Sequence, residues 1–89
     1  MKDAVLTPHA AYEMKRRGLE EEIIRGVAEN PEQTEQLRKG RWVFQSRLEM
    51  GFPPKTYLIR VIADTDRNPP EIVTAYRTTK ITKYWRKEE

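Results

Sequence analysis

The side chains that could carry out chemistry in this chain belong to two segments, one near its start and one near its end. His9 is the single histidine among 89 residues, and imidazole is the side chain that gains or loses a proton nearest neutral pH. Arg77, Lys80 and Tyr84 stand in the second segment, where cations alternate with aromatic rings. Cations neutralise nucleic-acid phosphates and rings stack on unpaired bases, so this composition is typical of single-strand recognition.

Metal-free cleavage of RNA is the reaction that these side chains suit best. RNA supplies its own nucleophile, the 2′-hydroxyl, so the protein has to exchange protons and stabilise the phosphorane. We expect His9 to exchange a proton, Arg77 to hold the phosphate through a bidentate fork and Lys80 to hold it as a point charge. Tyr84 would orient the substrate or assist the proton transfer.

Three further residues are candidates for substrate binding, namely Arg17, Thr79 and Arg47. A threonine hydroxyl can hydrogen-bond a phosphate, and the two arginines would extend a basic surface. Scattered charges are more often an ordinary solvated surface, and a threonine at this position could equally cap a helical turn. The sequence leaves both explanations open.

The main candidates have structural explanations as well. A lone histidine in the first turn of a helix is about as often a surface or capping residue as a catalytic one. Arg77 could pair with a helix carboxylate such as Glu13, and Lys80 could be solvated. Three residues of the terminal segment have the spacing of the apolar face of a short helix: Ile81, Tyr84 and Trp85. Core packing is the preferred explanation for Trp85.

Several classes of site are absent from the sequence. It contains no cysteine, which excludes disulfides, thiolate metal ligands and cysteine nucleophiles. A single histidine cannot form a metal-binding pair, and there is no Gly-rich phosphate loop. We therefore expect no metal site and no organic cofactor. No apolar run approaches the roughly 20 residues of a membrane helix, so we expect a cytoplasmic protein without membrane contact.

The basic character of the chain lies in its second half. The net charge is +3, but residues 1–36 hold five Lys or Arg against eight Asp or Glu, a net charge of −3. Residues 37–89 hold twelve against six, a net charge of +6. Such an asymmetry suits a surface that attracts an anion, although it would also serve solubility or an acidic partner.

Helix signals come first along the chain. Thr7 followed by Pro8 is a typical N-cap and first helical residue, and Gly18 ends the helix. A second helix is predicted from about Glu20 to Glu29, with glutamates at its positive end and an apolar face. The pair at residues 30–31, Asn-Pro, stops it.

Farther along the chain, apolar residues recur at every second position instead of at helical spacing. This pattern predicts four strands: 33–38, 41–48, 55–63 and 71–78. The third has apolar residues on both faces, as a central strand would. In the fourth, Val73, Ala75 and Arg77 are expected on one face, and Ile72, Thr74 and Tyr76 on the other. We predict a single α+β domain over residues 1–89, with two helices packed on a four-stranded antiparallel sheet and a short C-terminal helical turn.

Several short motifs, in this order, resemble a small prokaryotic family catalogued as a domain of unknown function. They are Thr7-Pro-His-Ala10, Met14-Lys-Arg-Arg-Gly18, Glu29-Asn-Pro31, Tyr76-Arg-Thr-Thr-Lys80 and Lys83-Tyr-Trp85. That family is more distantly similar to the RelE-like toxins, small metal-independent ribonucleases with helices on an antiparallel sheet.

The resemblance implies an RNA-cleaving toxin that would be paired with an antitoxin protein. The positions that match the polar motif residues of the family are His9, Arg77, Thr79, Lys80 and Tyr84. The chain is less basic than a typical RelE-like toxin and carries its histidine on the first helix, which argues against cleavage on the ribosome. The rival hypothesis is a module without catalysis that binds nucleic acid or an acidic protein. The oligomeric state is left open.

Overall fold

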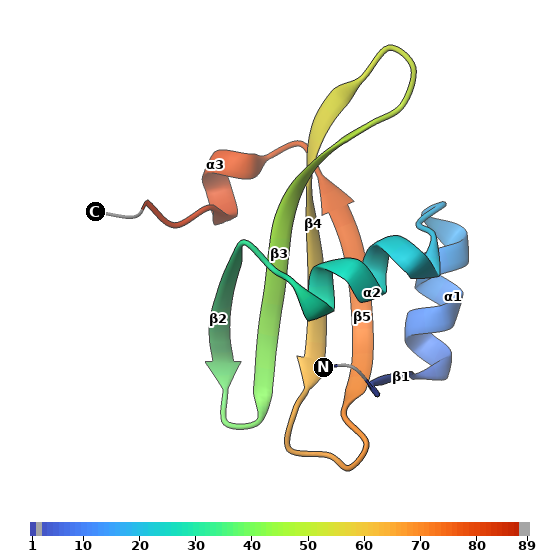
Figure 1. Cartoon of the computed structure of the whole chain (residues 1–89), viewed down its shortest axis with the longest axis vertical. Helices are drawn as coiled ribbons and strands as arrows, with labels where there is room; N and C mark the ends of the chain where they lie inside the picture. Colours follow the sequence, from blue (N-terminus) through green and yellow to red (C-terminus); the bar gives the residue numbers. More distant parts are fainter. Residues whose placement is uncertain (2, 88–89) are drawn as a thin grey trace.

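The computed structural model describes residues 1 and 3–87, and these form three helices and one five-stranded sheet (Figure 1). The strands are β1 (Val5–Leu6), β2 (Gln33–Arg38), β3 (Arg41–Met50), β4 (Lys55–Asp64) and β5 (Glu71–Thr78). The helices are α1 (Pro8–Arg16), α2 (Glu21–Glu29) and α3 (Ile81–Tyr84). The predicted helices and the four long strands are therefore present, in the predicted order.

The sheet has one strand more than predicted, and it is not purely antiparallel. Its order is β1-β5-β4-β3-β2, and β1 pairs in parallel with the start of β5 through two residues. The four-stranded antiparallel prediction was wrong in this respect. A two-residue strand is too short to produce a periodic pattern, so the sequence carries no signal for it.

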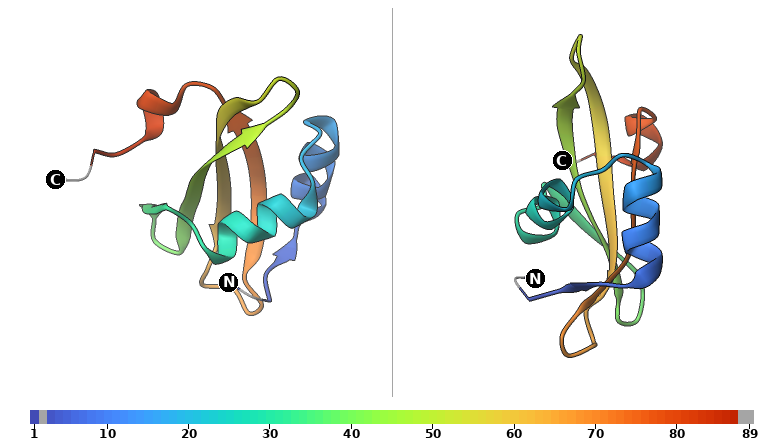
Figure 2. Two further views of the ribbon diagram at one scale, coloured as in Figure 1. Left: turned by 45° about the horizontal axis from the view of Figure 1, so that its top comes forward. Right: turned by 90° about the vertical axis from the view of Figure 1, so that its right-hand side faces the viewer.

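Helix α1 begins and ends as the sequence indicates. The Thr7 hydroxyl accepts a hydrogen bond from the Ala10 amide at 3.1 Å, and Pro8 occupies the first helical position. Gly18 follows the helix with a φ of +66°, a left-handed conformation that suits glycine. The helix lies beside β5 at the edge of the sheet, whereas α2 crosses β3 and β4 on one face (Figures 1 and 2). Of the two helices predicted to pack on the sheet, α2 covers a face, whereas α1 packs along the edge strand.

Helix α1 also protects the part of β5 that β1 leaves unpaired. The Thr7 hydroxyl lies 3.4 Å from the Val73 carbonyl oxygen, and Arg17 Nη1 donates to the Ala75 carbonyl at 3.0 Å. An exposed strand edge presents unpaired carbonyls to other chains, and side chains from α1 occupy two of them here. This contact fixes the end of α1 next to the end of β5.

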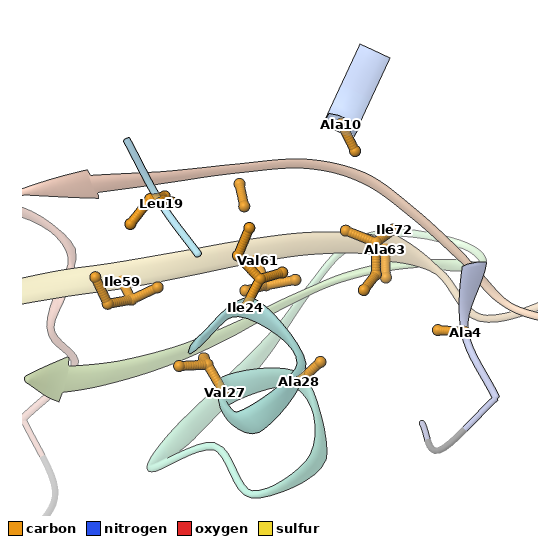
Figure 3. Packing of buried hydrophobic residues seen from close by; sticks show 11 residues of the cluster. Ala4, Ala10, Leu19, Ile24, Val27, Ala28, Ile59, Val61, Ala63 and Ile72 are labelled. Atoms are coloured by element: carbon orange, nitrogen blue, oxygen red, sulfur yellow. The ribbon is translucent and has the colours of Figure 1, made fainter. Parts of the chain in front are cut away.

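The hydrophobic core lies between α2 and the sheet. Figure 3 shows Ile24 of α2 directed toward Val61 of β4, and both side chains are buried. Ile59, Val61 and Ala63 are two residues apart along β4, so all three lie on the same face of the strand and are buried. Fully burying an aliphatic side chain of this size contributes about 1.5–3 kcal/mol, so this layer is the main source of stability.

The opposite face of β4 is polar at its centre. Arg60 is 7% exposed, although it lies in the middle of the sheet, and α3 with the residues after it covers this face (Figure 2, right). Every side-chain nitrogen or oxygen that is buried among the described residues has a hydrogen-bond partner. The sheet therefore separates an apolar layer from a polar one.

Strand β5 contains an irregularity that changes which residues share a face. Ala63 pairs with Ile72 while Ile62 pairs with Thr74, so Val73 is the extra residue of a bulge. Ile72 and Ala75 consequently both face the apolar core, so the prediction that placed Ile72 on the face opposite to Ala75 was wrong. The separation of Arg77 from Tyr76 is as predicted, because alternation is regular beyond the bulge.

Within the described range, no helix is long and apolar enough to cross a membrane. The same residues contain no group of three or more His, Cys, Asp or Glu side chains that could hold a metal ion.

Candidate functional site

A basic cavity of about 500 Å³ lies where β5 ends and the chain turns into α3. Seven residues line it: Arg17, Tyr76, Arg77, Thr78, Lys80, Lys83 and Tyr84. Four of them are cations and none is acidic. A hollow with this lining favours an anion, and a phosphate group is the common biological ligand of such size and charge.

Arg17 reaches the cavity from the C-terminal end of α1 and is held in place by two partners. Its Nη2 lies 2.8 Å from Glu13 Oε1, and its Nη1 donates to the Ala75 carbonyl. Its guanidinium carbon lies 5.6 Å from the centre of the Tyr76 ring, within cation–π range. The helix and the strand together therefore position this cation.

Glu13 is the carboxylate that organises the end of α1. It is 7% exposed and accepts two hydrogen bonds from Arg16, at 2.8 and 2.9 Å, besides its contact with Arg17. The Arg16 hydrogen bonds and the charges of Arg16, Arg17 and His9 outweigh burial and lower the pKa of Glu13 from 4.5 to about 2. The carboxylate is thus ionised at neutral pH, and it pairs with these arginines rather than with Arg77.

The two tyrosines of the cavity form a pair. The rings of Tyr76 and Tyr84 meet edge to face, with their centroids 6.4 Å apart and their planes at 70°. Buried Arg60 serves both: its Nη1 donates to the Tyr76 hydroxyl at 2.7 Å, and its guanidinium carbon lies 4.1 Å from the centre of the Tyr84 ring. Arg60 is thus the support on which the aromatic wall of the cavity rests.

The pKa values of the two tyrosine hydroxyl groups are shifted in opposite directions. Burial raises the pKa of Tyr76, and the hydrogen bond and charge of Arg60 offset only part of this. Burial also acts to raise the pKa of Tyr84, but the hydrogen bonds from Lys83 and Tyr76 and the charges of Lys83 and Arg60 lower it overall. Tyr84 is therefore the hydroxyl better suited to exchange a proton.

A polar network anchors α3 and the tail beneath the cavity. Gln45 Nε2 donates to Gln33 Oε1 at 2.8 Å and to the Tyr84 carbonyl at 3.3 Å, while Gln45 Oε1 accepts from Arg60 Nε at 3.0 Å. Gln33 Nε2 donates to the Arg86 carbonyl at 2.7 Å. Because α3 itself has no buried residue, these bonds hold it in place.

The structure brings Arg17, Lys80 and Tyr84 of the predicted site together but places His9 elsewhere. His9 is exposed in the first turn of α1 and does not line the cavity. It lies eight residues from Arg17, which corresponds to about 12 Å along a helix. The predicted cleft is therefore built from the end of α1, and the histidine stands at the other end.

Of the two remaining candidates in the C-terminal segment, Arg77 lines the cavity and Thr79 does not. Arg77 lines the cavity, yet it pairs with Ile59, so its side chain leaves the face of the sheet opposite to Tyr76. Its guanidinium carbon lies 5.0 Å from the centre of the Tyr57 ring. Thr79 is exposed and does not line the cavity, whereas its neighbour Thr78 does.

Arg47 and Trp85 form a separate contact on the polar side of the sheet. The guanidinium carbon of Arg47 lies 4.0 Å from the centre of the Trp85 ring, and its Nη2 lies 3.1 Å from Glu32 Oε2. Trp85 is partly buried and packs against this arginine, so the prediction that it packs in the hydrophobic core was wrong. Arg47 thus has a structural partner on each side and is not part of the cavity lining.

Sequence reasoning missed Tyr76, Lys83 and Arg60. The sequence places Tyr76 on a strand, and both Tyr76 and Lys83 in short motifs, without assigning either to the site, although alternation along β5 puts Tyr76 with Thr78 on the cavity face. Arg60 lies among apolar residues in the most buried strand. A charge in such a strand requires partners from elsewhere in the fold, and that requirement was the available signal.

A comparison with protein-family models shows the family of this chain. The chain belongs to the family described as Domain of unknown function (DUF4258), whose model matches residues 6–77. No curated protein and no solved structure shows significant similarity to it. The matched range contains Arg17, Arg60, Tyr76 and Arg77 and ends before Lys80, Lys83 and Tyr84.

Proposed function

We propose that the cavity binds a phosphate of single-stranded RNA and that the protein is a metal-independent, RelE-like endoribonuclease toxin. The observation that carries this proposal is the convergence of cations and a pair of tyrosine hydroxyls on one cavity without an acidic lining residue. Cationic stabilisation and proton exchange are what cleavage by the 2′-hydroxyl requires. The partner of such a toxin would be an antitoxin protein, and its substrate would be cytoplasmic RNA.

In the proposed reaction, the substrate phosphate lies among Arg17, Lys80 and Lys83. The 2′-oxygen attacks phosphorus, and the proton of its hydroxyl passes to the Tyr84 phenolate. The bond from phosphorus to the 5′-oxygen then breaks, and the leaving oxygen takes a proton from the Tyr84–Lys83 pair. The products are a 2′,3′-cyclic phosphate and a 5′-hydroxyl, and the pair regains its starting protonation state.

The Tyr84 hydroxyl replaces His9 as the proton-exchanging group in this scheme. Its pKa is lowered, chiefly by Lys83 acting against burial, so a larger fraction is phenolate at a given pH than in a free tyrosine. His9 is exposed at the far end of α1 and does not line the cavity. Its proposed contribution is limited to the charge that it places near Glu13.

A second candidate function is RNA binding without cleavage. The position of His9 outside the cavity favours it, because the chain then lacks an imidazole at the phosphate and depends on tyrosine alone. The same cavity would hold the backbone of the RNA, and the protein would act by binding the RNA without cleaving it.

Incubation of purified protein with single-stranded RNA in excess chelator tests the proposal. We expect 2′,3′-cyclic phosphate ends from the wild type and from His9→Ala, and cleavage slowed by at least about 10²-fold in Tyr84→Phe. Binding without new ends in the wild type would select the second candidate. Absence of both binding and cleavage would contradict both.

A further inference from the structure

The hairpin between β3 and β4 projects beyond the rest of the sheet at the end where the cavity lies (Figure 1). Its tip carries Phe52, whose side chain is fully exposed, with a relative accessibility of 101%. A fully exposed phenyl ring forgoes about 1.5–3 kcal/mol of burial, so this position contributes nothing to folding. Two prolines follow it, at residues 53 and 54, and these restrict the loop that presents the ring.

The stem of the hairpin continues this feature toward the cavity. Tyr57 is partly buried, and the exposed Arg77 lies over its ring with 5.0 Å between guanidinium carbon and ring centre. A guanidinium plane stacked on a ring is a surface on which a nucleobase stacks, and its N–H groups can also reach a phosphate. Lys55 is exposed between Tyr57 and the tip. Cation and aromatic side chains therefore alternate from Arg77 to Phe52.

Arg77 connects this stem to the cavity. It lines the cavity while its side chain lies on the other face of the sheet, so an RNA strand that leaves the cavity over the end of β5 meets the Arg77–Tyr57 stack next. From Tyr57 to Phe52 the chain spans five residues, at most about 17 Å at the rise of a strand. Because the Arg77–Tyr57 contact lies between the cavity and the tip, we expect a dinucleotide held in the cavity to end short of Phe52.

We propose that the β3–β4 hairpin is a base-stacking extension of the cavity, with the Arg77–Tyr57 stack as its inner position and Phe52 as its outer one. The inference rests on the proposed RNA binding and adds the substrate class: unpaired RNA longer than a dinucleotide, read by stacking and not by base edges. Single-stranded RNA fits this surface better than a protein partner does. The apolar groove that would suit a protein lies elsewhere, between α2 and β3.

Equilibrium binding of fully 2′-O-methylated RNA tests the inference, because such RNA cannot be cleaved. For a longer single strand, we expect Phe52→Ala to weaken affinity at least fivefold, the effect of losing one base stack. Phe52→Trp should retain affinity, and Phe52→Leu should behave as the alanine variant does, because it keeps an apolar side chain without a ring. For a dinucleotide, all four proteins should bind equally.

The salt dependence separates stacking from charge. Phe52→Ala should lower affinity at every salt concentration without changing the slope of log affinity against log salt, since it removes no phosphate contact. Because Phe52 is fully exposed, an unchanged circular-dichroism spectrum and melting temperature should accompany each variant.

Three outcomes would overturn the inference. In the first, Phe52→Ala and the wild type bind the longer RNA with equal affinity. In the second, Phe52→Ala loses affinity equally for both RNA lengths. In the third, the substitution weakens only the binding of a protein partner. Failure of the wild type to bind any RNA would instead remove the proposed function on which the inference rests. Normal wild-type cleavage that is indifferent to Phe52 would remove the inference alone.

Discussion

Tyr84 is surrounded by groups that act on its hydroxyl in opposite directions. Burial favours the neutral phenol, whereas Lys83, Tyr76 and Arg60 favour the phenolate, and the lowered pKa shows that the second group prevails. Its neighbour Tyr76 has a raised pKa because burial dominates there. Two hydroxyls in one cavity are therefore suited to different tasks, proton exchange and structural support.

Replacement of each tyrosine by phenylalanine separates those tasks. Tyr84→Phe should lower the rate of RNA cleavage by about 10²–10⁴-fold, the usual contribution of a proton-exchanging group, with RNA affinity nearly unchanged. Tyr76→Phe should retain most activity but lower the free energy of unfolding by about 1–3 kcal/mol, because buried Arg60 loses a hydrogen-bond partner. Single-turnover cleavage and urea unfolding measure the two effects. Equal activity loss in both variants would contradict the division of roles.

The lowered pKa of Tyr84 also sets the direction of the pH dependence. The rate should rise with pH in proportion to the phenolate fraction and level off below the pKa of about 10 of a free tyrosine. A rate that falls with rising pH, or that follows a histidine near neutrality and disappears in His9→Ala, would contradict the assignment of the base. Measured rates from pH 6 to 10 would decide between these outcomes.

Lys80 is one of the cations that line the cavity. Lys80→Ala should weaken binding of single-stranded RNA regardless of its sequence and reduce the salt slope by about 0.7, the value for one phosphate contact on a single strand. Lys39→Ala is the matched control, because Lys39 is exposed in the turn between β2 and β3 and lies outside the cavity lining. Equal effects of the two substitutions would mean that the attraction is general and has no defined site.

One buried carboxylate, that of Glu13, holds the arginines at the end of α1 in place. Glu13 has a folded-state pKa of about 2 against 4.5 when unpaired, so its pairing stabilises the fold fully above about pH 4.5. That stabilisation is lost as the pH falls toward 2. Glu13→Gln should therefore lower the melting temperature at pH 7 and flatten its decline between pH 5 and 2. An unchanged acid profile would show that the arginine contacts contribute nothing.

Helix α3 is an element held by polar contacts instead of apolar ones. Gln45→Ala removes a partner from Gln33, from Arg60 and from the Tyr84 carbonyl, and leaving a buried polar group unsatisfied costs about 1–3 kcal/mol. Gln36→Ala, on the exposed outer strand, should change the free energy of unfolding by no more than about 0.5 kcal/mol. Hydrogen exchange at residues 81–85 should accelerate in the first variant only. Equal exchange in both would place the anchor of α3 elsewhere.

Most helices and strands of the molecule could be predicted from residues that are neighbours in sequence, whereas the site could not. The cap formed by Thr7 and Pro8 and the period of two in the long strands depend on neighbours in sequence, so α1, α2 and β2 to β5 could be predicted. The two-residue β1 and the bulge at Val73 have no periodic signal. They nevertheless decide where α1 lies and which residues share a face.

The site depended on these long-range features. Arg60 is buried because three partners, one each from β3, β5 and α3, surround it, and no pattern within β4 predicts this. His9 and Arg17 stand on one predicted helix, but only the contact of Arg17 with β5 shows which end of that helix reaches the cavity. The residue types of a cationic and aromatic site were thus predictable, and their partners were not.

The central claim is that RNA phosphate binds in the cavity at the end of β5. Addition of fully 2′-O-methylated single-stranded RNA to isotope-labelled protein, followed by NMR, tests it most directly. We expect the largest chemical-shift changes at Arg17 and residues 76–84, with His9 and Lys39 unchanged. Changes centred on His9 or on the turn at Lys39, or no saturable change at all, would contradict it.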